Sequence, residues 1–271
     1  MPYFYDYFAK GYREGRKGNL FQDPADVFGG VGPEDVRSCR QVLKNAYAGY
    51  RTGRNEEALR RLAREYREYV SGCHDAKARD RHNAFVYRHM LEVPVGSRAI
   101  AARLGVAKET VLNYVDRCFD ELLALCMGIP ASGRRPDDRE SAVRMLVDGS
   151  RLFSSMAGDY VSCLFPGKRE REAVERGRRA TRRGMGQLAE AVEAYSGYCN
   201  DGHFSIDVDI RKAEILQKCI AGASPAAIAE GYGCCQSTVY ADIRENERRL
   251  AAMLFDDGGS KGGWPPGGAA L

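Results

Sequence analysis

Residues 97–127 read SRAIAARLGVAKETVLNYVDRCFDELLALCM, and residues 225–255 read PAAIAEGYGCCQSTVYADIRENERRLAAMLF. The two stretches align without a gap, at an offset of 128 residues. Each copy has the pattern of a short helix, a tight turn and a longer helix, which is typical of a helix-turn-helix motif. The matched pairs are Ile100/Ile228, Ala101/Ala229, Gly105/Gly233, Thr110–Val111/Thr238–Val239, Val115/Ile243 and Leu122/Leu250.

The matched positions have a physical explanation. A small side chain at Ala101 and Ala229 lets two helices cross closely. Gly105 and Gly233 follow the first helix, where glycine adopts a left-handed conformation at little cost. The second helix of the first copy begins its inward pattern at Thr110, and helical spacing then predicts one apolar face made of Val111, Val115, Cys118, Phe119, Leu122 and Cys126.

The stretch AIAARLGVAKETVLNYVDRCFDELLA resembles the promoter-reading C-terminal region of sigma-70-type factors. It is equally similar to the related helix-turn-helix of response-regulator and phage transcription activators. The resemblance extends over the preceding helices expected at 77–92 and 207–221, and no stretch resembles the promoter-melting region of a complete sigma factor. It implies that the second helix of each motif enters the major groove of double-stranded DNA. It also implies RNA polymerase as a candidate partner.

In the first copy, the exposed start of the second helix predicts side chains that read base edges. Lysine suits the acceptors of guanine, asparagine can pair with adenine, and glutamate can accept from cytosine. Basic side chains around them are expected to contact phosphates and set the register. The alternative is that these charges only solvate an exposed face. The candidates for base contact are Lys108, Glu109, Leu112 and Asn113, and those for phosphate contact are Arg98, Arg103 and Arg117.

The second copy lacks some of these features. Alanine and glycine replace Arg98 and Arg103, while Asn246 and Glu247 stand where the first copy has Cys118 and Phe119. We therefore expect the first motif to dominate DNA affinity, and the second either to add a weaker half-site or to contact protein. The candidate contacts in the second copy are Gln236, Ser237, Tyr240 and Arg244.

The rest of the chain is also helical in period, so the sequence predicts an all-α fold with two helical domains that each end in a helix-turn-helix unit. The expected domains are 33–128 and 138–256, joined by a linker at 129–137. A disordered tail is expected at 257–271. Residues 1–32 form an aromatic and basic arm that we interpret as packed on the first domain. Upstream of the motifs, no residue-level repeat is visible.

Composition narrows the function further. The net charge is only +4, so nucleic-acid affinity must come from local patches. The densest basic stretch, 168–183, could track a phosphate backbone or could simply be a solvated helix face. The nine cysteines form no C-x-x-C pair, and the nearest ligand pair is Cys199 with His203, so neither a metal nor a cofactor is expected. No leader or membrane span is apparent, which favours a cytoplasmic protein.

These observations favour a DNA-binding transcription regulator with a tandem repeat of the sigma-like motif. Two linked motifs gain effective concentration, because the second contact becomes intramolecular. The alternative is a phage DNA-packaging or assembly protein, similar to a terminase small subunit, that uses the same motif in an oligomeric ring. An enzyme is not expected, since the four histidines show no spacing with carboxylates or a nucleophile and no Gly-rich phosphate loop exists. The oligomeric state is left open.

Overall fold

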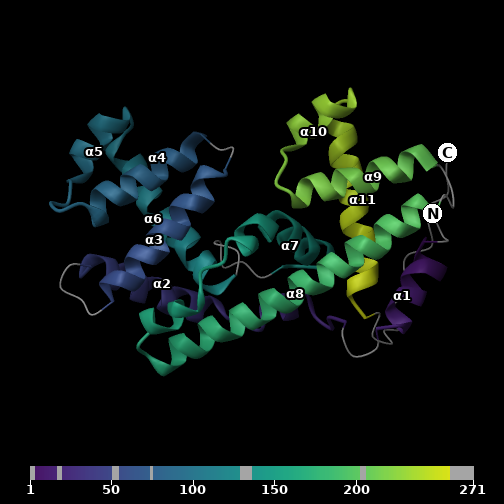
Figure 1. Cartoon of the computed structure of the whole chain (residues 1–271), viewed down its shortest axis with the longest axis horizontal. Helices are drawn as coiled ribbons and strands as arrows, with labels where there is room; N and C mark the ends of the chain where they lie inside the picture. The colour runs from purple at the N-terminus through teal and green to yellow at the C-terminus, as the bar shows by residue number, and fades with distance from the viewer. Residues whose placement is uncertain are drawn as a thin grey trace. The chain divides into compact units, whose positions relative to one another are not determined.

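The computed structural model describes residues 4–16, 20–50, 55–73, 76–128, 136–201 and 206–256 (Figure 1). Helices account for all the regular elements in these ranges, and an isolated bridge pairs Phe21 with Phe255. The predicted all-α fold is therefore confirmed for the described residues. The expected tail at 257–271 and most of the expected linker, 129–135, lie outside them.

Dense internal contacts divide the chain into two units, which we call unit A and unit B. Unit A comprises Val27–Arg135 and Met145–Met185. Unit B comprises Met1–Asp26, Pro136–Arg144 and Gly186–Leu271. Residues 145–185, which follow the expected linker in the sequence, thus group with the unit that contains the first motif. Helices α7 (Arg139–Ser154) and α8 (Lys168–Asn200) contribute residues to both units.

Unit A contains the elements that position the first motif. They are the 3₁₀ helix η2 (Pro24–Phe28, from Val27 on), α2 (Pro33–Ala48), α3 (Glu56–Ser71), α4 (Ala76–Phe85), the π-helical turn η3 (Val86–Met90), α5 (Ser97–Leu104), α6 (Lys108–Met127) and the 3₁₀ helix η4 (Asp159–Leu164), with parts of α7 and α8.

An aromatic cluster holds α2, α3, α4 and α6 of unit A together. Phe85 packs edge-on against Tyr47, with ring centroids 5.0 Å apart, and against Phe119, at 5.6 Å. Tyr66 of α3 also meets the Phe85 ring edge-on. All four rings are at most 2% exposed. Edge-to-face pairs of this kind contribute about 0.5–1.5 kcal/mol each beyond the burial of their area.

Unit B contains the second motif and the N-terminal segment. Its elements are the π-helical turn η1 (Phe4–Ala9), α1 (Lys10–Glu14), α9 (Ile206–Ile220), α10 (Pro225–Tyr232) and α11 (Gln236–Leu254), with the remaining parts of α7 and α8. One buried carboxylate of this unit is paired with an arginine. Glu247, which replaces the apolar Phe119 of the first copy, has a side chain only 5% exposed, and Arg144 of α7 binds its carboxylate with contacts of 2.7–3.1 Å.

The N-terminal segment packs on α11, which corrects the expectation that it would cover the first domain. Phe21 donates from its backbone N–H to Leu254 O at 3.0 Å, and Asp256 N–H donates to Phe21 O at 3.0 Å. The rings of Phe21 and Phe255 are both buried, with centroids 5.5 Å apart. Arg13 of α1 donates to the carbonyl of Ala252. Aromatic residues in the arm indicated burial, but they carried no information about which helix would cover them.

Candidate nucleic-acid interface

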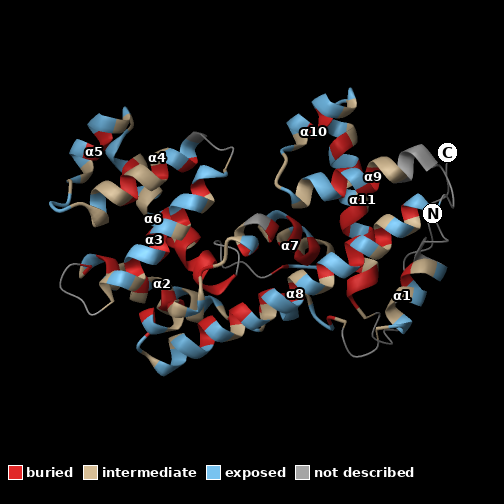
Figure 2. Cartoon of the chain, in the orientation of Figure 1, coloured by how far each residue is buried: buried red, intermediate tan, exposed pale blue. Residues whose placement is uncertain are grey.

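Two long helices, α6 and α11, are buried over most of the C-terminal half, whereas the N-terminal half exposes one face and buries Val111, Val239 and Asp242 (Figure 2). Every residue of α6 from Cys118 to Met127 is buried except Asp120. In α11 the buried set runs from Asn246 to Leu254, apart from Arg248 and Ala252. At about 1.5 Å per residue these helices are ~30 Å long, so roughly half of each length is available to a partner.

A short helix and a glycine turn precede each long helix. Gly105 closes α5 with φ 66°, and Gly233 closes α10 with φ 59°, so both adopt the predicted left-handed conformation. We define the first module as α4, η3, α5 and α6, and the second module as α9, α10 and α11. Ile100 and Val111 are buried in the small core of the first module. Their counterparts Ile228 and Val239 are buried in the second.

The exposed half of α6 carries the residues expected to contact DNA. Leu112 is 46% exposed, unusual for a large apolar side chain, and its neighbours on the same face are also exposed. Arg103 lies over the ring of Tyr87, with its guanidinium carbon 5.0 Å from the ring centroid. Arg117 pairs with Glu121 at 3.4 Å. The structure places all seven candidates of the first module at exposed positions: Arg98, Arg103, Lys108, Glu109, Leu112, Asn113 and Arg117.

Helix α2 supplies cations that the sequence analysis did not anticipate at this face. Lys44 Nζ lies 2.7 Å from Asp116 Oδ1, and Arg40 Nε lies 2.5 Å from Asp120 Oδ1. Asp116 is one turn beyond Leu112 and Asn113 on the exposed side of α6. These pairs offset negative charges that would otherwise repel phosphates close to the candidate contacts. They join residues distant in sequence, so helical periodicity could not have indicated them.

The second module exposes its four candidates as well, with weaker charge. Tyr240 is 48% exposed, and Gln236, Ser237 and Arg244 are exposed beside it. Arg244 Nε donates to Tyr240 O at 3.3 Å, which keeps its guanidinium along the outer face of α11. A cation that sequence reasoning missed is Lys218 of α9, whose Nζ lies 4.1 Å from the ring centroid of Tyr232. Lys218 is exposed, and its contact with Tyr232 holds its charge beside α10.

Cys235 occupies the N-cap of α11 and is exposed. Its Sγ lies 2.9 Å from Ser237 Oγ and 3.1 Å from Thr238 Oγ1. Hydrogen bonds from Ser237, then from Thr238, lower the pKa of the Cys235 thiol to about 7. A thiolate is therefore available near neutral pH at the start of this helix.

A buried polar network fixes the first module against α3. Tyr66 Oη lies 2.6 Å from Glu121 Oε2 and 3.2 Å from Cys118 Sγ. Cys118 donates to Arg81 O at 3.2 Å, and Arg81 Nη2 donates to Glu121 Oε1 at 3.1 Å. Burial raises the pKa of the Cys118 thiol to about 12. Burial also raises the pKa of the Tyr66 hydroxyl well above its ordinary value, so both groups keep their protons.

The second module contains a network with the same plan. Tyr195 of α8 donates to Asn246 Oδ1 at 2.9 Å and accepts from Arg249 Nη1 at 3.0 Å. Asn246 Nδ2 donates to Lys212 O of α9 at 2.9 Å. Burial raises the pKa of Tyr195, which keeps its hydroxyl protonated. Arg249 pairs with Glu245 at 3.0 Å, so the buried charge is again balanced.

The two networks occupy equivalent positions. Cys118 and Glu121 in α6 correspond to Asn246 and Arg249 in α11, each at the same offset of 128 residues. In both modules a buried tyrosine from a neighbouring helix contacts both members of the pair. The first member, Cys118 or Asn246, also donates a hydrogen bond to a backbone carbonyl of the module's first helix, α4 or α9. The similarity between the modules therefore includes a buried tyrosine on a further helix, although the charge at the second position of the pair is reversed. The sequence did not indicate this shared arrangement, because the pair changes from Cys and Glu to Asn and Arg.

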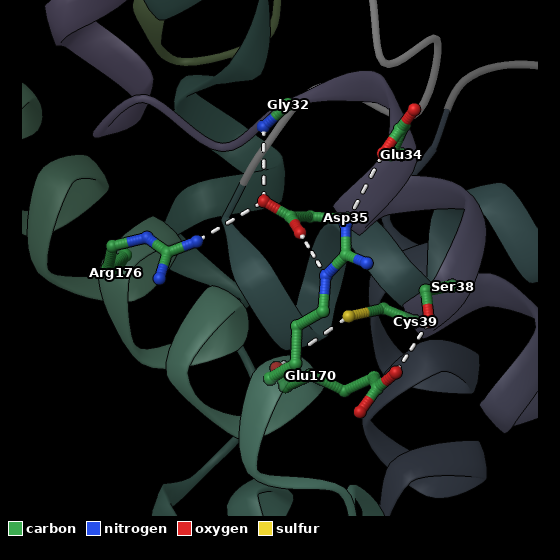
Figure 3. A network of polar contacts seen from close by, with 8 residues as sticks. Gly32, Glu34, Asp35, Ser38, Cys39, Glu170 and Arg176 are labelled. Carbon is green, nitrogen blue, oxygen red and sulfur yellow. Dashed lines mark hydrogen bonds and ion pairs between the residues drawn. The ribbon is translucent and has the colours of Figure 1, made fainter.

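The basic stretch of α8, 168–183, lies within unit A and contributes to its packing (Figure 3). Asp35, near the start of α2, accepts from Arg169 Nε at 3.1 Å and from Arg176 Nη2 at 3.2 Å. Glu170 accepts from Ser38 Oγ at 2.6 Å. The side chain of Arg178, 9% exposed, donates to the carbonyls of Cys126 and Ala157. These contacts hold α2 and the end of α6 in place.

Other basic side chains of this stretch also have partners within unit A. Arg182 pairs with Asp159 at 3.3 Å, and Arg171 donates to the carbonyl oxygens of Phe165 and Pro166. The stretch thus combines internal contacts, such as those of Arg178, with an exposed face that includes Lys168 and Arg179, as expected of a solvated helix face. The internal contacts were not expected, because their acidic partners come from distant parts of the sequence. A phosphate-tracking role for the exposed face stays a prediction.

Among the described residues, no three His, Cys, Asp or Glu side chains are grouped closely enough to bind a metal ion. His203, half of the nearest expected ligand pair, lies outside those residues. The helices that the structure describes include none with the length and apolar character needed to cross a bilayer. This chain matches no protein-family model, no curated protein and no solved structure.

Proposed function

We propose that the protein is a sequence-specific, double-stranded DNA-binding transcription regulator whose two modules are helix-turn-helix units. The exposed N-terminal half of each long helix is the observation that carries the proposal. A helix anchored by one half can insert its other half into the major groove, which is wide enough to admit it. In the first module that half presents Lys108, Glu109, Leu112 and Asn113 at exposed positions.

Arginines around the first module suit the phosphate backbone. Arg98 and Arg103 lie on α5, which precedes the inserted helix, and both are exposed. The stacking of Arg103 on Tyr87 limits the freedom of its side chain, which reduces the entropic cost of binding a phosphate. Phosphate contacts of this kind would position the module, and the base contacts would provide sequence preference.

Alanine variants test this proposal by the salt dependence of binding. For Arg103→Ala we expect weaker binding to DNA and a slope of log affinity against log salt that is smaller by about one, since one phosphate is no longer neutralised. Arg244→Ala is expected to weaken binding less, because the first module carries more charge. Lys10→Ala, which removes a side chain 64% exposed on α1, is the control and should leave binding unchanged. Equal losses of DNA affinity for Arg103→Ala and Arg244→Ala would contradict the expectation that the first module dominates binding.

Thiol labelling tests the second module separately. Cys235 at the start of α11 and Cys163 in η4 are both exposed, so both should react with iodoacetamide. If α11 enters a groove, DNA should slow the labelling of Cys235 and leave that of Cys163 unchanged, as measured by mass spectrometry. Equal labelling rates of Cys235 with and without DNA would mean that this helix does not contact the duplex.

A further inference from the structure

The two modules share the positions of their small cores but differ at the exposed positions on α6 and α11. The buried networks and cores fix the register, so each exposed position of α6 has a definite counterpart in α11. At these positions no residue type is shared. The exposed pairs are Lys108/Gln236, Glu109/Ser237, Leu112/Tyr240, Asn113/Ala241 and Asp116/Arg244.

Some buried positions of the two helices, by contrast, are shared. On the inside, Val111 matches Val239 and Leu122 matches Leu250, and all four are buried. The position after Asp116 also differs, with Arg117 matched by Glu245, and both are held by contacts within their own module. Two copies reading the same base sequence would need the same side chains at the exposed start of the helix, because those groups make the base contacts.

We infer that the protein recognises a composite DNA site with two dissimilar blocks, one read by each module. This inference rests on the proposed function and adds the kind of site that the function requires. Lys108 and Asn113 suit a first block that contains both guanine and adenine. Gln236 pairs with adenine and the methyl group of Ala241 packs against thymine, so the second block is richer in A·T pairs. A repeat or a palindrome of one block would not suit both modules.

The deciding experiment selects bound sequences from a random double-stranded DNA pool with the full chain. A second selection uses an exchange variant, Gln236→Lys, Ser237→Glu, Tyr240→Leu and Ala241→Asn, which gives α11 four of the five exposed residues of α6 and keeps Arg244. These positions are exposed, so the fold should tolerate the substitutions. A control variant makes related substitutions on α1, Lys10→Gln and Glu14→Ser, where the side chains are 64% and 60% exposed.

The wild type should enrich two different blocks, and the exchange variant should enrich two similar ones. Binding of the exchange variant to the wild-type site should weaken about tenfold or more for each base pair that α11 no longer recognises. The α1 control should select the wild-type site. If thermal melting shows that the exchange variant is unfolded, the single substitution Ala241→Asn repeats the comparison at the second block.

The failures of the two proposals can be separated. If the wild type enriches two copies of one block, or one block that the exchange leaves unaltered, the composite site is wrong while DNA recognition by the first module stands. If the wild type enriches no sequence at all, the proposed function itself is wrong.

Discussion

At the scale of single residues, burial decides the chemistry of several titratable groups. His89 of η3 packs against Phe85 and Phe119, with ring centroids 5.4 and 5.3 Å away. Burial, with a smaller effect of Arg88, lowers the pKa of His89 to about 4. The folded state therefore resists protonation of His89 at a pH where the unfolded chain, with a pKa of about 6.5, accepts a proton.

The pH dependence of stability follows from this difference. Between about pH 6.5 and pH 4 the unfolded state binds more protons at this position, so His89 makes the free energy of unfolding fall as pH falls. Above pH 6.5 it has no such effect. On acidification the free energy of unfolding should fall by roughly 2 kcal/mol less, at most, in His89→Gln than in the wild type. Urea unfolding of both proteins at pH 7 and pH 4.5 measures it, and parallel losses in the two proteins would show that His89 is not responsible.

At the scale of helices and turns, the left-handed glycines should be the positions least tolerant of a side chain. Gly233→Ala places a Cβ at φ 59° and is expected to lower the free energy of unfolding by about 1 kcal/mol. Gly197→Ala is the matched substitution in the same unit, at an exposed position of α8 where a Cβ meets no atom within 4 Å. It should stabilise the protein by roughly 0.5–1 kcal/mol. Similar effects of the two substitutions on thermal unfolding would contradict this account.

Elements could be predicted from the sequence more readily than their partners. The apolar periodicity and the glycines at helix ends predicted α5, α6, α10 and α11, because these signals are local. The exposed candidate residues followed from the same pattern. The contacts of Asp116 with α2 and of Arg176 with Asp35 could not be predicted, because ion pairs between distant segments leave no periodic signal. The same reason explains why the N-terminal arm was assigned to the wrong surface.

At the scale of the whole molecule, the two linked modules should reinforce each other on DNA. On a duplex carrying both blocks, Tyr240→Ala with Arg244→Ala should remove the gain from linkage, which reaches a factor of about 10²–10⁴ for linked binding units. On a short duplex carrying only the first block, the same variant should bind like the wild type. Fluorescence anisotropy on both duplexes measures the difference. Equal affinity of variant and wild type on the longer duplex would show that the second module contributes nothing.

The pairing of Phe21 with Phe255 also bears on how the chain is made. On the ribosome, the segment that contains Phe21 emerges about 230 residues before the helix that receives it. The buried ring of Phe21 therefore lacks its final neighbours while most of unit A is synthesised and can assemble. Unit B can complete itself only once α11 has emerged, which makes the segment around Phe21 the part most dependent on protection in a nascent chain.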